Sequence, residues 1–117
     1  LPMDENSIPT GALFPVDGSA FDFRTPTRLS KNLGLHDPQL EVAGGIDHCF
    51  VLNQSEDCAI LYHEGSGREL ILSTTEPGLQ VYTSNYMNAS FTGKHGIRPG
   101  KRAAICLETQ HFPDSIN

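Results

Sequence analysis

The chain has 117 residues, of which 38% are hydrophobic and 19% charged, and its formal net charge is −6 at pH 7. These values are typical of one globular domain or part of one, and they exclude a disordered or fibrous protein. Because the chain has only 8 Lys and Arg residues and no apolar run long enough to cross a bilayer, we expect neither nucleic acid nor a membrane as a partner.

Short strands separated by turns are the main elements that the sequence predicts. Eleven Gly and eight Pro residues divide the chain, and no window carries a long apolar stripe with helical period, which favours an all-β fold. In chain order, a weak strand is expected at 20–24, followed by at most one short helix, at 27–33 between Pro26 and Gly34. Stronger strands follow at 48–52, 57–63, 68–74, 79–83 and 104–109.

The connections between these strands differ in length. The segments 57–63 and 68–74 should form a hairpin around the turn at 64–67. The stretches 34–47 and 84–101 are predicted to be long loops, which in a compact protein are usually functional or covered by other parts of the fold.

The last strand carries the first candidate residue, Glu108. Alternation along a strand places Ala104, Cys106 and Glu108 on one face, so this carboxylate has small and apolar neighbours. A carboxylate that loses hydration holds its proton more readily and becomes a candidate proton carrier near neutral pH. The alternative is a glutamate at a strand end that points into water, as most glutamates do.

Two further polar residues stand beside turns, Asp47 after Gly44-Gly45 and Gln80 after Pro77-Gly78. Together with Glu108 they supply two carboxylates and an amide from separate strands. Such groups suit a sugar, because carboxylates accept hydrogen bonds from vicinal hydroxyls and an amide both donates and accepts. The alternatives are that Asp47 only caps a turn and that Gln80 faces solvent.

Cysteine and histidine usage predicts neither disulfides nor metal. The cysteines Cys49, Cys58 and Cys106 are odd in number and lack CxxC spacing, so we expect free thiols in a reducing compartment and a cytoplasmic location. A carboxylate next but one to Cys106 disfavours a nucleophilic thiolate there, and we interpret this residue as packing. The histidines show no spacing typical of metal ligands, so no metal site is expected.

Four stretches resemble the aldose 1-epimerase (galactose mutarotase) family, in the family's own order. They are LPMDENSIPTG at 1–11, GIDHCF at 45–50, TTEPGLQVYTSN at 74–85 and CLETQHFPDSIN at 106–117. Each is weak alone, but four in register from end to end of the chain make the resemblance specific. Ile46 departs from the aromatic residue usual before the family's aspartate, a change that we expect to alter packing rather than chemistry.

The resemblance implies part of a large β-sandwich enzyme that interconverts the α and β anomers of hexoses such as galactose and glucose, without metal or organic cofactor. It implies that Glu108 is the catalytic base, that Asp47 and Gln80 bind the sugar, and that His48 is an orienting or packing residue.

The resemblance also bears on domain organisation. We interpret residues 1–117 as the C-terminal portion of a single domain that is incomplete at both ends. The acid histidine would lie outside this segment, and the remainder of the domain would pack on it. The segment alone is then expected to be poorly active or inactive.

Two other functions stay open at this point. One is a carbohydrate-binding β-sandwich module that keeps Asp47 and Gln80 but transfers no proton. The other is a mutarotase-like protein for hexose 6-phosphates, which needs an arginine cluster for the phosphate, whereas the arginines here are scattered along the sequence.

Overall fold

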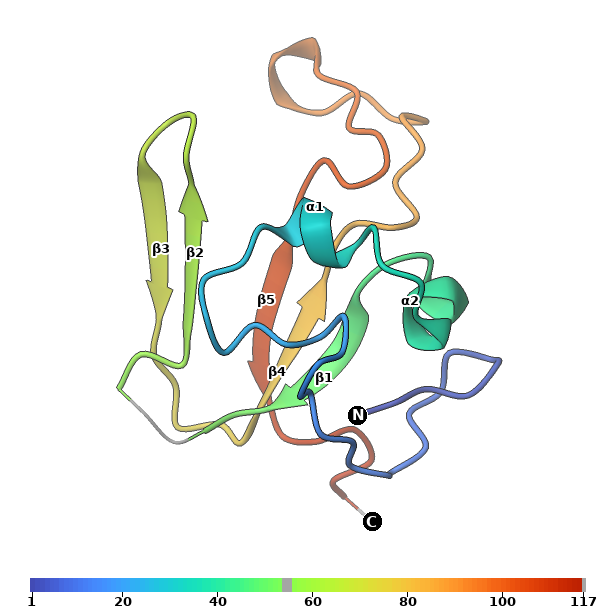
Figure 1. Ribbon diagram of the computed structural model, residues 1–117. Coiled ribbons are helices and arrows are strands. Elements are labelled where there is room, and N and C mark those ends of the chain that lie inside the picture. Colours follow the sequence, from blue (N-terminus) through green and yellow to red (C-terminus); the bar gives the residue numbers. More distant parts are fainter. Residues whose placement is uncertain (54–55, 117) are drawn as a thin grey trace.

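The computed structural model describes residues 1–53 and 56–116. Asn117, the last residue of the fourth stretch quoted above, lies outside the described residues. Two antiparallel sheets organise the chain (Figure 1). One has three strands in the order β1-β4-β5, and the other is the β2-β3 hairpin. The strands are β1 (Asp47–Val51), β2 (Ala59–His63), β3 (Arg68–Leu72), β4 (Gly78–Tyr82) and β5 (Cys106–Gln110).

The strand-based fold expected from the sequence is confirmed, because each of the five stronger predicted strands overlaps one of these elements. The helices are α1 (Leu29–Asn32), α2 (Pro38–Ala43) and the 3-10 turn η1 (Lys94–Gly96). Among the helices in the described part of the chain, none is long and apolar enough to cross a membrane.

The expectation of at most one short helix is wrong, because α2 lies within the stretch predicted to be a loop. Its ends follow ordinary capping rules. The Asp37 side chain accepts a hydrogen bond from the Gln39 backbone N–H, Pro38 occupies the first turn, and Gly44 ends the helix in the left-handed conformation with φ +66°. These caps fix a helix of only six residues, too short to show an apolar stripe.

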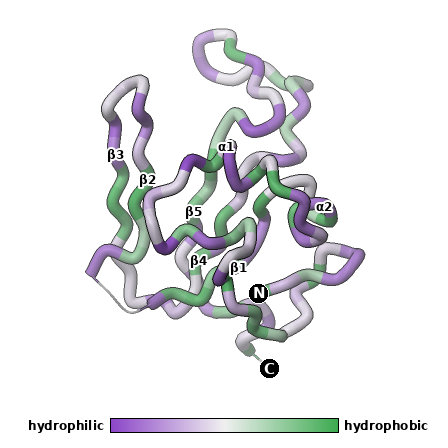
Figure 2. The backbone as a smooth tube through the Cα atoms, in the orientation of Figure 1, coloured by the Kyte–Doolittle hydropathy of each residue, from purple (hydrophilic) through white to green (hydrophobic). Residues whose placement is uncertain are grey.

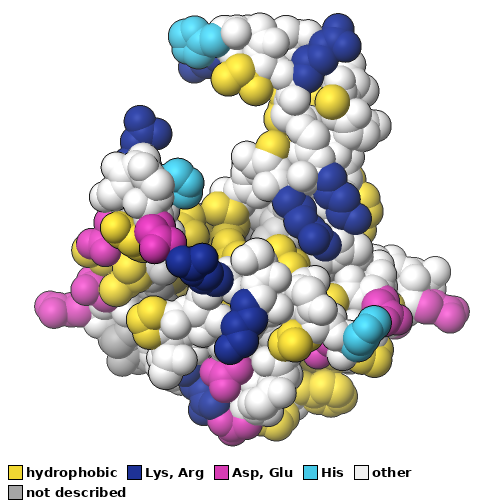
Figure 3. All heavy atoms as spheres, turned by 45° about the horizontal axis from the view of Figure 1, so that its top comes forward, with side chains coloured by type: hydrophobic (Ala, Val, Ile, Leu, Met, Phe, Trp, Pro, Cys, Tyr) yellow, Lys and Arg dark blue, Asp and Glu magenta, His cyan; other side chains and the backbone are white. Residues whose placement is uncertain are grey.

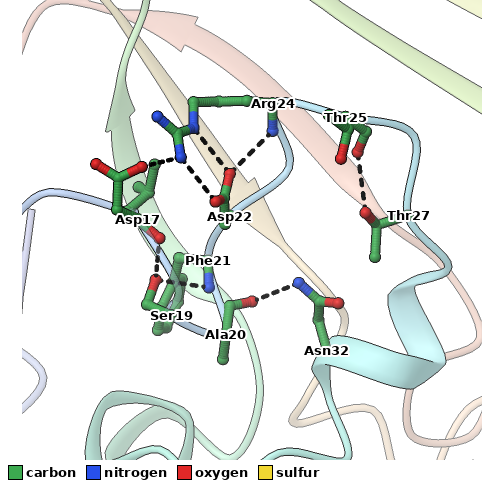
Figure 4. A network of polar contacts seen from close by, with 10 residues as sticks. Asp17, Ser19, Ala20, Phe21, Asp22, Arg24, Thr25, Thr27 and Asn32 are labelled. Atoms are coloured by element: carbon green, nitrogen blue, oxygen red, sulfur yellow. Dashed lines mark hydrogen bonds and ion pairs between the residues drawn. The ribbon is translucent and has the colours of Figure 1, made fainter.

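The weak strand expected at 20–24 is also wrong, because this segment forms turns (Figure 4). Ser19 Oγ donates to the Val16 carbonyl and accepts from the Phe21 N–H, which bends the chain locally. Arg24 forms ion pairs with Asp17 and Asp22, and its guanidinium lowers the pKa of Asp22 to about 2. Local polar contacts of this kind compete with strand pairing.

One face of the three-stranded sheet carries the hydrophobic core. The segment before α1, together with α1 itself, lies on the near side of the sheet in Figure 1. Buried Ala20, Leu40 and Ile46 form the centre of this core, and Phe50 of β1 and Val81 of β4 pack against it. The opposite face of the sheet therefore remains available for polar side chains.

The β2-β3 hairpin stands apart from the three-stranded sheet (Figure 1). Apolar residues occupy much of both arms (Figure 2), and the side chains of Ile60, Tyr62 and Ile71 are more than half exposed. Figure 3 shows the hairpin projecting from the molecule, with hydrophobic side chains in the hollow beside it. Much apolar surface of this hairpin is therefore uncovered within the described part of the chain.

Candidate functional site

Asp47, Gln80 and Glu108 share one face of the three-stranded sheet. Cys49 of β1 lies opposite Gln80 of β4, and Gln80 lies opposite Glu108 of β5. Asp47 is two residues before Cys49 and so points to the same side. This face is the one opposite to the Phe50 and Val81 side chains, so the sheet separates the three polar residues from the core.

Asp47 and Gln80 are in direct contact. The Gln80 side-chain amide donates from Nε2 to Asp47 Oδ1 at 2.8 Å, and both residues are half-buried. They are diagonal neighbours on adjacent strands, a separation that long polar side chains can bridge. The bond fixes the orientation of the amide and holds a carboxylate and an amide side by side, a pair able to accept from and donate to hydroxyl groups.

A hollow of ≈ 270 Å³ opens on this face beside the pair. Its volume is a little below the range of about 300–1,000 Å³ that is usual for ligand pockets. Its lining combines three side chains of the sheet face with the end of β5 and the N-terminal segment; among the described residues it consists of Asp47, Cys49, Gln80, Gln110, Pro113, Leu1, Met3, Ser7 and Pro9. Asp47 and Gln80 thus line a concave surface, whereas Glu108 lies on the same face outside this lining.

Glu108 is exposed, so the expectation that apolar neighbours strip this carboxylate of water is wrong for the described chain. The physical reason is its place in the sheet, because within residues 1–53 and 56–116 β5 pairs with β4 alone. Its nearest neighbour across the strands is Gln80, a polar residue. The structure therefore has Glu108 beside the Asp47–Gln80 pair and in contact with solvent.

The start of β1 is held in place through the residue before Asp47. The buried Ile46 backbone N–H donates to Thr83 Oγ1 at 3.0 Å, and its carbonyl accepts from Asn85 Nδ2 at 2.9 Å and from the Thr83 N–H at 3.0 Å. Gly45 makes this approach possible, because its φ is +152° and a Cβ there would lie 2.1 Å from Asn85 Oδ1. The close approach of Asn85 therefore explains the glycine at position 45, two residues before Asp47.

His48 lies on the core face, away from Asp47. It is only 4% exposed, and its ring packs edge-on against Phe21 with centroids 4.5 Å apart. Burial lowers the pKa of His48 to about 4. Nδ1 accepts from the Asp47 N–H, and Nε2 lies 3.2 Å from Gln39 Oε1, which fits a neutral ring that donates from Nε2. This geometry agrees with an orienting or packing residue.

Among the remaining candidates for chemistry, Cys49 lines the hollow, whereas Cys106 and His111 lie outside its lining. His111 Nδ1 pairs with Glu76 Oε2 at 2.5 Å, and the three cysteines are free. Within residues 1–53 and 56–116, no three His, Cys, Asp or Glu side chains lie close enough together to hold a metal ion. Sequence reasoning missed Thr83 and Asn85, because their contacts with Ile46 span more than 35 positions and leave no local signal.

Known proteins are similar to this chain along its whole length. The family model described as aldose 1-epimerase matches residues 1–117. The galactose mutarotase of Homo sapiens is 45% identical over 120 residues, and the aldose 1-epimerase of Escherichia coli is 33% identical over 122 residues. Both alignments cover 100% of this chain and 34% of the relative, so the chain spans about a third of the length of these proteins.

A solved structure agrees with these relatives. The crystal structure of galactose 1-epimerase from Lactobacillus acidophilus superposes with a TM-score of 0.83 at 32% identity, covering 95% of this chain and 32% of that one. The likeness confirms the expected all-β fold class, part of a large β-sandwich.

Proposed function

Because this chain belongs to the aldose 1-epimerase family, we propose that the protein containing it interconverts the α and β anomers of a hexose such as galactose or glucose. The relatives named above are called galactose mutarotase and aldose 1-epimerase. The observation that carries the proposal is the common face of Asp47, Gln80 and Glu108, together with the 2.8 Å bond that joins the first two.

The reaction needs a proton acceptor and a proton donor. The acceptor removes the proton of the C1 hydroxyl while the donor protonates the ring oxygen, so the C1–O5 bond breaks and the aldehyde forms. Rotation about C1–C2 then presents the other face of the aldehyde. Reclosure returns a proton to the C1 oxygen and releases the one on O5, so the sugar leaves with no net change in protons.

Glu108 is the proposed proton acceptor. Its exposed carboxylate on the edge strand can meet a hydroxyl group that approaches from the open face of the sheet. It lies directly across from Gln80, so a sugar held by the Asp47–Gln80 pair has its next polar neighbour at Glu108. Covering of this face in the whole protein would remove water and strengthen the interactions of the carboxylate with the sugar.

Asp47 and Gln80 are the proposed sugar-binding residues. Asp47 accepts from hydroxyl groups, and Gln80 donates and accepts. Holding these hydroxyls keeps the open-chain aldehyde in place during rotation, which favours reclosure over escape. Because their contact is already formed and half-buried, little side-chain ordering remains when a sugar binds.

The proton donor and part of the fold are proposed to come from the rest of the domain. The chain spans about a third of its relatives, and the resemblance implies that the acid histidine lies outside this segment. The exposed Ile60, Tyr62 and Ile71 of the hairpin offer an apolar surface on which the remainder can pack. Burying these side chains would stabilise the domain by about 1.5–3 kcal/mol for each large apolar residue fully covered.

The test is the mutarotation of freshly dissolved α-galactose by the full-length protein, followed by polarimetry. Glu108→Gln should lower the rate about 10²–10⁴-fold, the usual contribution of a positioned proton transfer, while galactose binding measured by calorimetry persists. Glu41→Gln, which changes an exposed carboxylate on α2, is the matched control and should leave both unchanged.

Two outcomes would contradict the proposal. Equal mutarotation by the wild type and Glu108→Gln would remove Glu108 as the base. Binding of galactose without any mutarotation by the wild type would favour the carbohydrate-binding module.

A hexose 6-phosphate is disfavoured as substrate, because Arg24 and Arg28 are paired with carboxylates and Lys and Arg side chains are spread over several elements (Figure 3).

A further inference from the structure

A closed set of hydrogen bonds surrounds Ile46, the residue directly before Asp47. Its members, Ile46, Thr83 and Asn85, are each no more than 6% exposed. Thr83 and Asn85 follow β4, the strand that carries Gln80. The set therefore links the beginning of β1 to the end of β4, next to the Asp47–Gln80 pair.

Each hydrogen bond of this set uses a different donor or acceptor. The Ile46 carbonyl accepts from two N–H groups, those of the Thr83 backbone and the Asn85 side chain, which uses both of its lone pairs. The Thr83 hydroxyl accepts from the Ile46 N–H and donates to Asn85 Oδ1 at 2.7 Å, the nearer of its two possible acceptors. This last bond orients the Asn85 amide so that its Nδ2 faces the Ile46 carbonyl.

The side chains of Thr83 and Asn85 act away from the candidate sugar face. Tyr82 lies opposite Asp47 and shares its face, so alternation turns Thr83 to the core side. Neither residue lines the hollow beside Asp47 and Gln80. Their effect on the site passes through the Ile46 backbone, one peptide bond from Asp47.

We propose that Thr83 and Asn85 are positioning residues that fix the Asp47 carboxylate against Gln80 for sugar binding. This inference rests on the proposed function. With both backbone groups of Ile46 held, Asp47 has little freedom to shift along or away from β4. A displacement of about 1 Å in a positioned site can lower activity roughly 100-fold. Loss of the hydrogen bonds to Ile46 should therefore weaken sugar binding.

The experiment compares variants of the full-length protein by KM and kcat for mutarotation and by the calorimetric Kd for galactose. Thr83→Val removes the hydroxyl but keeps the shape, and Thr83→Ser keeps the hydroxyl. Asn85→Ala removes one donor to a buried carbonyl. Asn32→Ala is the matched control, because Asn32 is 4% exposed and donates through Nδ2 to the Ala20 carbonyl at 3.0 Å, in the core (Figure 4).

Thr83→Val and Asn85→Ala should each raise KM and Kd by about 10-fold or more, with a smaller change in kcat, whereas Thr83→Ser should stay near the wild type. Asn32→Ala should lower thermal stability to a similar degree and leave KM unchanged. In an Asp47→Ala background, Thr83→Val should have little further effect on Kd, because the group that it positions is gone. If Thr83→Val does not fold, Asn85→Ala carries the same comparison.

Several results would overturn the inference. One is an equal change in KM for Asn85→Ala and for the control Asn32→Ala, in a protein whose wild type is active. Another is an increase in Kd from Thr83→Val that is as large in the Asp47→Ala background as in the wild type. A wild type that neither binds nor anomerises hexoses would instead overturn the proposed function, and the inference with it.

Discussion

The buried histidine behind the candidate site makes stability depend on pH in a defined window. Burial lowers the pKa of His48 from 6.5 to about 4. Between these values the unfolded chain binds a proton that the folded chain does not, so the free energy of unfolding falls as the pH decreases from about 6.5 toward 4. At pH above 6.5 the ring is neutral in both states and contributes no pH dependence.

The size of the effect follows from the pKa shift. At about 1.4 kcal/mol per pKa unit, the free energy of unfolding near pH 4 is about 3 kcal/mol lower than above pH 6.5. Protonation also has a local cost, because Nδ1 accepts the Asp47 N–H at 3.1 Å, and a protonated nitrogen would oppose that donor. Acid should therefore loosen the start of β1 together with the site.

Urea denaturation of the full-length protein between pH 4 and 8 measures this effect. The curve for His48→Gln should lack the part of the slope between pH 6.5 and 4 that comes from this one ring, whereas His63→Gln, at an exposed hairpin position, should match the wild type. The difference between the curves cancels the carboxylates common to all three proteins. Parallel curves for His48→Gln and the wild type would refute the reasoning.

Three further substitutions in the full-length protein test the local structure through the free energy of unfolding in urea. Asp37→Ala removes the cap of α2 and should cost about 0.5–2 kcal/mol; an effect no larger than that of Glu41→Ala in the same helix would contradict this. Ser84→Gly should stabilise by about 1 kcal/mol, because Ser84 has φ +53° and a buried hydroxyl that finds no hydrogen-bond partner among the described residues, and a loss of stability would count against it. Gly45→Ala should cost about 3 kcal/mol or more through its clash with Asn85, and a cost equal to that of Gly11→Ala, where φ is +79° but space is open, would exclude the clash.

The strands could be predicted from sequence because their signals are local. Runs of β-branched and apolar residues between turn residues located all five strands. Helix α2 was missed because six residues between Asp37 and Gly44 are too few for a periodic pattern. Its caps, Asp-Pro at the start and Gly-Gly at the end, were the better signal.

The candidate site was predictable in part. Strand alternation and turn position identified Asp47, Gln80 and Glu108, but which strands pair, and in what register, depends on contacts between distant residues. The predicted environment of Glu108 was wrong for this reason, since alternation does not reveal that β5, in the described part of the chain, pairs with β4 alone and that Glu108 is exposed to water. Thr83 and Asn85 depend on contacts with Ile46 across more than 35 positions, and local patterns carry no information about them.

The most direct measurement of the central claim is a crystal structure of the full-length protein with galactose bound. Our account predicts the C1 hydroxyl within about 2.6–3.2 Å of a Glu108 carboxylate oxygen, and other hydroxyl groups on Asp47 and Gln80. A sugar bound elsewhere, with the Glu108 carboxylate turned away from C1, would contradict it.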